Sequence, residues 1–115
     1  MPAPAAVADD ASLSDTREWA LRRLGEQITL RQLARHAGLS QRTLMRRFTE
    51  ETGTTPLQWL LDARLGLARE LLETTDHPVD RVARDCGPGT AANLRLHFRR
   101  ALNTTPTAYR HTFGS

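Results

Sequence analysis

The chain has 115 residues, enough for one compact domain with a buried core and too few for two. Its formal net charge is +3, and every one of its sixteen lysine-or-arginine residues is arginine, the side chain best suited to bidentate contacts with phosphate and guanine. A single cysteine, no long apolar run and no signal-peptide pattern exclude a disulfide framework and a membrane span, so we expect a cytoplasmic protein.

Residues 1–12 are rich in alanine and proline and show no hydrophobic periodicity. Such a segment lacks the bulk to pack, so we interpret it as a disordered interdomain linker. A linker at this position leads us to expect that the chain is the C-terminal part of a longer protein whose N-terminal domain is absent.

A first helix is expected after this linker. Ser12 or Ser14 is suited to cap it, and it should continue to about Leu24, where Gly25 stops it. Trp19 lies on this helix, and a single tryptophan on an amphipathic helix is more often part of the core than a base-stacking residue.

A short helix, a tight turn and a second helix follow over residues 29–52. Thr29 and Gln32 form a capping box at the start of the short helix. Gly38 supplies the positive φ that ends this helix in a sharp turn, and Ser40 caps the next helix. The order of elements is that of a helix-turn-helix, whose second helix enters the major groove of DNA.

The second of these helices has two faces. Leu44 and Phe48 are expected to point inward, while Arg42 and Arg46 project together on the other side. A solvated arginine face is the ordinary alternative, but the pattern recurs about fifty positions later. The recurring pairs are Gly38 with Gly87, Leu44 with Leu94, Phe48 with Phe98, Thr54-Thr55-Pro56 with Thr104-Thr105-Pro106, and Trp59 with Tyr109.

This duplication predicts two copies of one supersecondary unit, the second at about residues 79–102. Two units in one chain imply a monomer that reads two successive stretches of groove. Between them, residues 56–73 predict a helix of roughly 25 Å, a spacer that sets the recognition helices near one turn of B-DNA, about 34 Å, apart. Gly66 inside it marks either a close packing contact or a slight flexibility.

In the second unit, Pro78 should open a helix that ends at Cys86. Thr90 or Gly89 should begin the second recognition helix, and Asn103 fits a left-handed position at its end. A short closing helix should follow from Pro106 to His111, with Tyr109 packed inward. The predicted fold class is therefore all-α, with two helix-turn-helix subdomains joined by a long central helix, about seven helices in all.

The second unit also carries a family pattern. It runs through Gly87, Leu94, Phe98, Arg99-Arg100, Thr105-Pro106 and Tyr109-Arg110. On these residues the chain, over about residues 13–112, resembles the C-terminal DNA-binding domain of AraC/XylS-type transcriptional regulators. Residues 53–56 and 91–98 make it similar, more narrowly, to actinobacterial regulators with an amidotransferase-like N-terminal domain, such as the A-factor-responsive activator of streptomycetes. Pro88 departs from the family, which usually has an aromatic residue there.

The geometry and the resemblance agree on Arg42 and Arg46 as base-reading residues, with guanine O6 and N7 the expected targets. Gln41 and Thr43 are secondary readers, and Ser40 and Arg47 are expected to contact phosphates. In the second unit Ala91, Ala92, Asn93 and Leu96 stand where the first has Gln41, Arg42, Thr43 and Arg46, a poorer set of donors.

We therefore expect the second unit to be less specific for the DNA sequence that it binds. Asn93 and Arg95 are its candidate base readers, while Ala91 and Ala92 are suited to thymine methyl groups. Thr90, Arg99 and Arg100 are the candidate phosphate contacts. For Arg99 and Arg100 a solvated helix face is an equal alternative.

No serine, cysteine or carboxylate arrangement supports catalysis, so we expect no enzyme. Cys86 with His77 or His97 lacks zinc-ligand spacing and is interpreted as a small core residue, so no metal or cofactor is expected. Double-stranded DNA is the expected partner, with RNA polymerase as a partner of the full regulator and no membrane. The isolated domain should bind DNA as a monomer, and the full protein should dimerise, if at all, through its N-terminal domain. The alternative function is a helical protein-interaction module.

Overall fold

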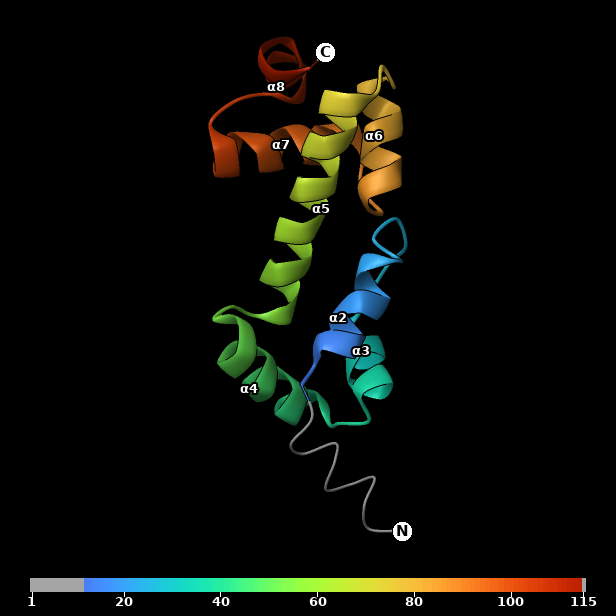
Figure 1. The fold of residues 1–115 in the computed structure, drawn as a ribbon, viewed down its shortest axis with the longest axis vertical. Helices are drawn as coiled ribbons and strands as arrows, with labels where there is room; N and C mark the ends of the chain where they lie inside the picture. Colours follow the sequence, from blue (N-terminus) through green and yellow to red (C-terminus); the bar gives the residue numbers. More distant parts are fainter. Residues whose placement is uncertain (1–11, 115) are drawn as a thin grey trace. The chain divides into compact units, whose positions relative to one another are not determined.

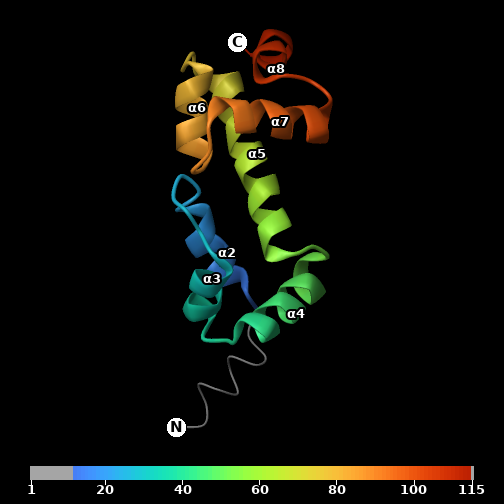
Figure 2. The ribbon, with the colours of Figure 1, turned by 180° about the vertical axis from the view of Figure 1, so that it is seen from behind.

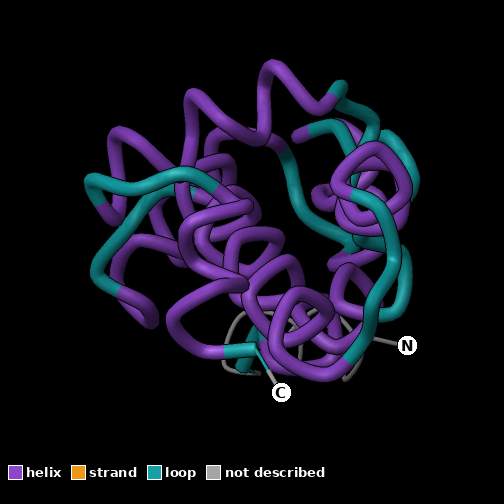
Figure 3. Tube along the Cα trace, turned by 90° about the horizontal axis from the view of Figure 1, so that it is seen from above, coloured by secondary structure: helices purple, strands orange, loops and turns teal. Residues whose placement is uncertain are grey.

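A computed structural model describes residues 12–114. In that part of the chain seven α-helices are connected by loops, without strands (Figures 1 and 3). They are α2 (Ser14–Leu21), α3 (Leu30–Ala37), α4 (Gln41–Thr52), α5 (Pro56–Thr74), α6 (Val79–Cys86), α7 (Ala91–Leu102) and α8 (Pro106–Phe113). The predicted all-α fold class is confirmed. The predicted linker, except Ser12, lies outside the described residues.

The chain divides into two compact units. In the described part, unit 1 holds residues 12–23 and 28–60, and unit 2 holds residues 24–27 and 61–114. Unit 1 thus contains α2, α3, α4 and the first turn of α5, and unit 2 contains the rest of α5 with α6, α7 and α8. Each unit contains one of the two helix-turn-helix pairs.

The helix pair of unit 1 follows its predicted caps closely. The Thr29 hydroxyl accepts from the Gln32 amide at 3.1 Å while the Gln32 side chain accepts from the Thr29 amide at 2.8 Å, so the capping box is complete. Gly38 has φ 71°, in the left-handed region that favours glycine. The core of the unit is then closed by buried side chains of the helix pair, Leu33, Ala34, Leu44 and Phe48.

The first helix differs from the prediction in its ends. α2 stops at Leu21, not near Leu24. Just beyond it the Arg23 side chain donates to the Trp19 carbonyl at 3.0 Å and lies 4.7 Å over the Trp19 ring. The Arg23 side chain thus donates to a carbonyl that would accept from the backbone amide four residues on if the helix continued, and the helix ends there. Trp19 is half-buried and stacks on His36 at 5.0 Å between ring centroids, which makes it a packing residue at the edge of the core.

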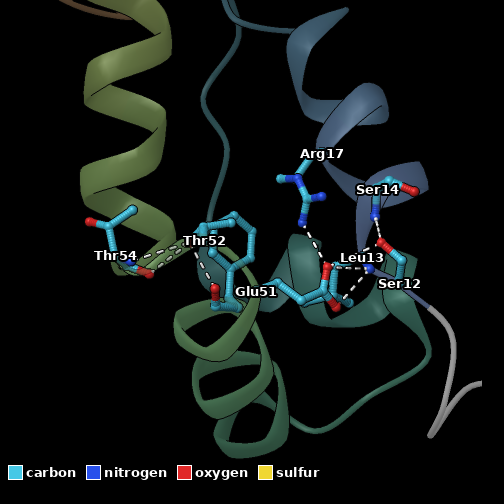
Figure 4. Close-up of polar contacts among 8 residues, drawn as sticks. Ser12, Leu13, Ser14, Arg17, Glu51, Thr52 and Thr54 are labelled. Atoms are coloured by element: carbon cyan, nitrogen blue, oxygen red, sulfur yellow. Dashed lines mark hydrogen bonds and ion pairs between the residues drawn. The ribbon is translucent and has the colours of Figure 1, made fainter.

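The start of α2 is capped from α4 (Figure 4). The N-cap residue is Leu13, so the expected caps Ser12 and Ser14 do not occupy that position. Both oxygens of the Glu51 carboxylate accept from the Leu13 amide, at 2.9 and 3.0 Å, and one also accepts from the Ser12 hydroxyl at 3.1 Å. Arg17 completes the set with an ion pair at 2.9 Å. One carboxylate on the second helix of the pair therefore anchors the N-terminal helix of unit 1.

Unit 2 repeats the packing of unit 1. Its core gathers side chains from four helices, namely Leu65, Ala68, Leu72, Val82, Ala83, Cys86, Leu94, Phe98 and Tyr109. α7 lies across the C-terminal half of α5, as the front and back views both show (Figures 1 and 2). Phe98 meets Tyr109 edge to face at 5.7 Å and 76°, and Phe48 meets Trp59 in unit 1 at 5.6 Å and 73°. The duplication read from the sequence extends to the aromatic pair that holds each recognition helix.

The two turns differ. Gly87 has φ 168°, which is extended backbone, so it does not repeat the left-handed turn of Gly38. A Cβ at Gly87 would lie 2.9 Å from Cδ of Arg64, whose guanidinium donates to the carbonyls of Leu24 and Glu26 at 3.0 and 2.8 Å. Close approach of Arg64 is therefore what requires glycine here. The extra residue in this turn lets the chain reach the next cap in an extended conformation.

Two further predicted ends are confirmed, whereas α8 continues two residues beyond its predicted end at His111, to Phe113. Asn103 takes the left-handed position with φ 54°. Thr90, not Gly89, is the N-cap of α7, and Thr105 is the N-cap of α8. At Gly66 a Cβ would meet nothing within 4 Å, so this glycine does not mark a close packing contact.

Candidate nucleic-acid interface

Helix α4 presents its two main predicted reading residues, Arg42 and Arg46, to solvent because its other face is fixed in the core. The Ser40 hydroxyl accepts from the Thr43 amide at 3.1 Å and sets where the helix begins. Leu44 and Phe48 are fully buried, and this fixes the rotation of the helix. Arg42 therefore stands exposed on the outer face.

Arg46 lies on the same outer face, one turn further on. It forms an ion pair with Glu50 at 3.4 Å, and both side chains are more than half exposed. An exposed pair of this kind contributes little, so the arginine is available to a ligand at small cost. Met45 is also exposed on this helix, although it was not among the predicted contact residues.

The secondary residues of α4 are less open. Gln41 is exposed, but Thr43 is half-buried and its hydroxyl accepts from the Ser40 hydroxyl at 3.0 Å. Arg47 is half-buried as well. Ser40 itself is exposed at the start of the helix, where a phosphate contact was predicted.

Helix α7 is built in the same way. The Thr90 hydroxyl accepts from the Asn93 amide at 3.2 Å, and Leu94 and Phe98 turn inward. Ala91 is half-buried, and the other predicted contact residues are exposed. These are Thr90, Ala92, Asn93, Arg95, Arg99 and Arg100.

Leu96 was not among the predicted contact residues of α7, because a leucine cannot donate a hydrogen bond as Arg46 does. It is 49% exposed and is the exposed large hydrophobic residue of this helix. The sequence contains a signal for this position, because Leu96 corresponds to Arg46 in the duplication and should therefore lie on the outer face of its helix. The outer face of α7 is thus apolar where that of α4 is charged.

Charge also distinguishes the two helices. α7 carries Arg95, Arg99 and Arg100 and no acidic residue, whereas α4 carries Glu50 and Glu51. Burial by itself would raise the pKa of Glu51, but the hydrogen bonds from Arg17, Leu13 and Ser12 outweigh it and hold this pKa below its ordinary value. Glu51 therefore stays ionised, and its charge is matched by Arg17 within unit 1.

Cys86 has the surroundings of a core residue. It is 3% exposed, and burial, with a smaller effect of the Asp85 charge, raises the pKa of its thiol to about 12. A thiol that stays protonated is neither a nucleophile nor a metal ligand. Among the described residues no three histidine, cysteine or acidic side chains are grouped to hold a metal ion, and no helix is long and apolar enough to cross a membrane.

Comparison with known proteins gives concordant matches. A family described as a helix-turn-helix domain matches residues 33–112. The activator RhaS of Salmonella schwarzengrund, an HTH-type transcriptional activator, is 36% identical over 101 residues, which are 88% of this chain and 36% of RhaS. The chain therefore spans about a third of the length of these curated relatives.

Two solved structures extend the comparison. The DNA-binding domain of AdpA, described as the global transcriptional factor and solved in complex with a target DNA, is 46% identical, with a TM-score of 0.84 over 88% of this chain and 91% of that one. The C-terminal domain of AraT, a response regulator from Geobacillus stearothermophilus, is 25% identical, with a TM-score of 0.84 over 90% and 86% of the two chains.

Two helix-turn-helix pairs, each with an exposed recognition helix, define the class of this chain as a two-unit DNA-binding domain of a transcription regulator. Within that class, the chain belongs to the AraC-type helix-turn-helix family. The family expected from the sequence is confirmed. An amidotransferase-like N-terminal domain stays a prediction, as do the roles of the individual contact residues.

Proposed function

We propose that this domain binds double-stranded DNA in a sequence-specific manner, with α4 and α7 in successive segments of the major groove. The observation that carries the proposal is the paired exposure of Arg42 and Arg46 on a capped helix whose opposite face is fully buried. Each guanidinium group can donate to both O6 and N7 of a guanine, and the two groups lie one turn apart on a rigid helix. Family membership favours this function over a protein-interaction module.

In this proposal Arg42 and Arg46 read base edges and Gln41 and Thr43 assist them. Asn93, Arg95 and Ala92 read the second segment less strictly. Ser40, Arg47, Thr90, Arg99 and Arg100 contact phosphates, which position the protein without reading sequence. The first helix therefore dominates the choice of site.

The partners of the whole regulator are also part of the proposal. The isolated domain binds DNA as a monomer, because each unit supplies its own recognition helix. RNA polymerase is the proposed partner of the full protein in the cytoplasm, as expected of an activator, and dimerisation is assigned to an N-terminal domain. The domain is proposed to have no catalytic activity, as its membership of a family of DNA-binding transcription regulators favours.

Selection of bound duplexes from a random DNA pool, followed by sequencing, tests the proposal. We expect a motif with a firm half that contains guanine and a looser half about one helical turn away. Affinity for the selected duplex should fall steeply with salt, since arginine contacts to phosphate release counterions. Enrichment of no motif, with no salt-dependent binding, would contradict the proposal and favour the protein-interaction module.

A further inference from the structure

The outer face of α7 has an apolar centre within a basic border. Ala92, Leu96 and Arg99 follow one another at spacings of four and three residues, on the side of the helix opposite Leu94 and Phe98. Leu96 stands in the middle of this row and is 49% exposed. Leu96 belongs neither to the buried core of unit 2 nor to the partly buried hydrophobic residues that pack against this core.

A single exposed leucine on a protein surface is ordinary. Leu96 differs because the duplication gives it the place that Arg46 has on α4. It also differs in its surroundings, since α7 bears three exposed arginines and no acid. Such a border suits the phosphates on both sides of a groove, and it places the leucine toward the groove floor.

The floor of the major groove offers one apolar group, the 5-methyl group of thymine. We infer that Leu96 is a specificity-determining residue that contacts this methyl group and so selects a thymine in the half-site bound by unit 2. The inference rests on the proposed function and makes it specific. Where α4 selects guanine by hydrogen bonds, α7 selects thymine by apolar contact.

Replacement of thymine by uracil tests this contact, because uracil lacks the methyl group and keeps the same hydrogen-bonding atoms. The half-site of unit 2 is identified by repeating the selection with an Arg42→Ala variant. It is the half of the motif whose preferred bases are the same for the variant and the wild type. Each deoxythymidine of that half is replaced in turn by deoxyuridine, and the dissociation constant is measured. At one position the wild-type domain should bind about four-fold more weakly, as expected for the loss of one buried methyl group.

The variants decide which residue makes the contact. Leu96→Ala should bind the thymine and uracil duplexes equally at that position, and Leu96→Met, which keeps an apolar side chain of similar reach, should retain the preference. Leu21→Ala is the matched control, since Leu21 is 48% exposed on α2, outside both recognition helices, and this variant should behave as wild type.

Two outcomes would overturn the inference while leaving the proposed function intact. The first is equal wild-type binding of thymine and uracil duplexes at every position of the half-site. The second is a preference that persists in Leu96→Ala. Absence of any selected duplex would instead mean that the proposed function itself is wrong.

Discussion

At the scale of the residue, helix rotation decides which side chains of α4 are free to meet a ligand. Leu44 and Phe48 are fully buried, and the Phe48 ring packs edge to face on Trp59. This packing leaves the Arg42 and Arg46 side chains exposed and outside the core. Substitution of either should therefore change binding and leave stability nearly unchanged.

Arg42→Ala and Arg46→Ala should each weaken binding to the selected duplex by about 1–3 kcal/mol and relax the demand for guanine. Arg99→Ala, which removes a proposed phosphate contact, should weaken binding to specific and random duplexes alike. Fluorescence anisotropy on the two duplexes, with urea unfolding as a check on stability, measures both effects. Equal losses on both duplexes for Arg42→Ala would contradict its base-reading role.

At the scale of the element, single side chains fix how a helix begins or ends. Glu51 accepts from the Leu13 amide and binds Arg17 within unit 1, so α4 holds the start of α2 (Figure 4). In unit 2, Arg64 holds the loop at residues 24–27 through two carbonyls and packs on Gly87. Both contacts join segments that are far apart in sequence.

Glu51→Gln should destabilise the domain near neutral pH by about 1 kcal/mol, because the neutral amide accepts more weakly from Arg17 and Leu13. The pKa of Glu51 is lowered in the folded state, so its contribution is complete above the unfolded value of 4.5 and is lost as the pH falls through the folded value. The stability difference between wild type and variant should therefore shrink as the pH falls below 4.5.

Urea unfolding across this pH range measures the effect. Glu50→Gln is the matched control, since its carboxylate lies on the same helix, is 62% exposed and pairs only weakly with Arg46. It should change stability little at any of these pH values. A stability difference for Glu51→Gln that stays constant with pH would contradict the assigned role of the carboxylate.

Gly87→Ala should destabilise the domain by about 1–3 kcal/mol, because its Cβ would lie 2.9 Å from an Arg64 side chain that two hydrogen bonds hold in place. Gly66→Ala is the comparison, since it adds a methyl group to open space inside α5 and should stabilise by about 0.5–1 kcal/mol. Thermal unfolding of the two variants measures both changes. A stable Gly87→Ala variant would show that Arg64 moves aside freely.

At the scale of the whole molecule, the duplication provides two recognition helices on similar supports with different outer faces. Both units share the aromatic pair, the inward leucine and phenylalanine and the threonine or serine cap. They differ on the outer face, where Ala92 and Leu96 of α7 occupy the positions that Arg42 and Arg46 occupy in α4. The units should therefore differ in the bases they demand more than in their fold.

A transplant of the arginines tests this statement. Ala92→Arg combined with Leu96→Arg should leave the domain folded, since both positions are exposed, and should make the looser half-site demand guanine. Selection from the random pool measures the change. Thr107→Arg with Ala108→Arg adds the same charge at exposed positions of α8 and should raise affinity without changing the motif. An unchanged motif in the transplant would mean that α7 does not read bases.

The sequence by itself determined the helices, the duplication and the two-faced recognition helices. These follow from local chemistry, because caps such as Thr29 and Ser40, the left-handed positions of Gly38 and Asn103 and the inward spacing of Leu44 and Phe48 depend on neighbours within one turn. The same local rules gave the wrong end for α2 and the wrong cap at its start.

Only the tertiary structure decided the contacts that join distant segments. The Glu51 cap on Leu13 and the approach of Arg64 to Gly87 depend on where other elements lie. The local sequence around a glutamate or an arginine is the same whether its side chain meets solvent or a backbone group some forty residues away, so the sequence pattern does not reveal the partner. Periodicity therefore predicts which face a residue occupies, and packing alone selects its partner.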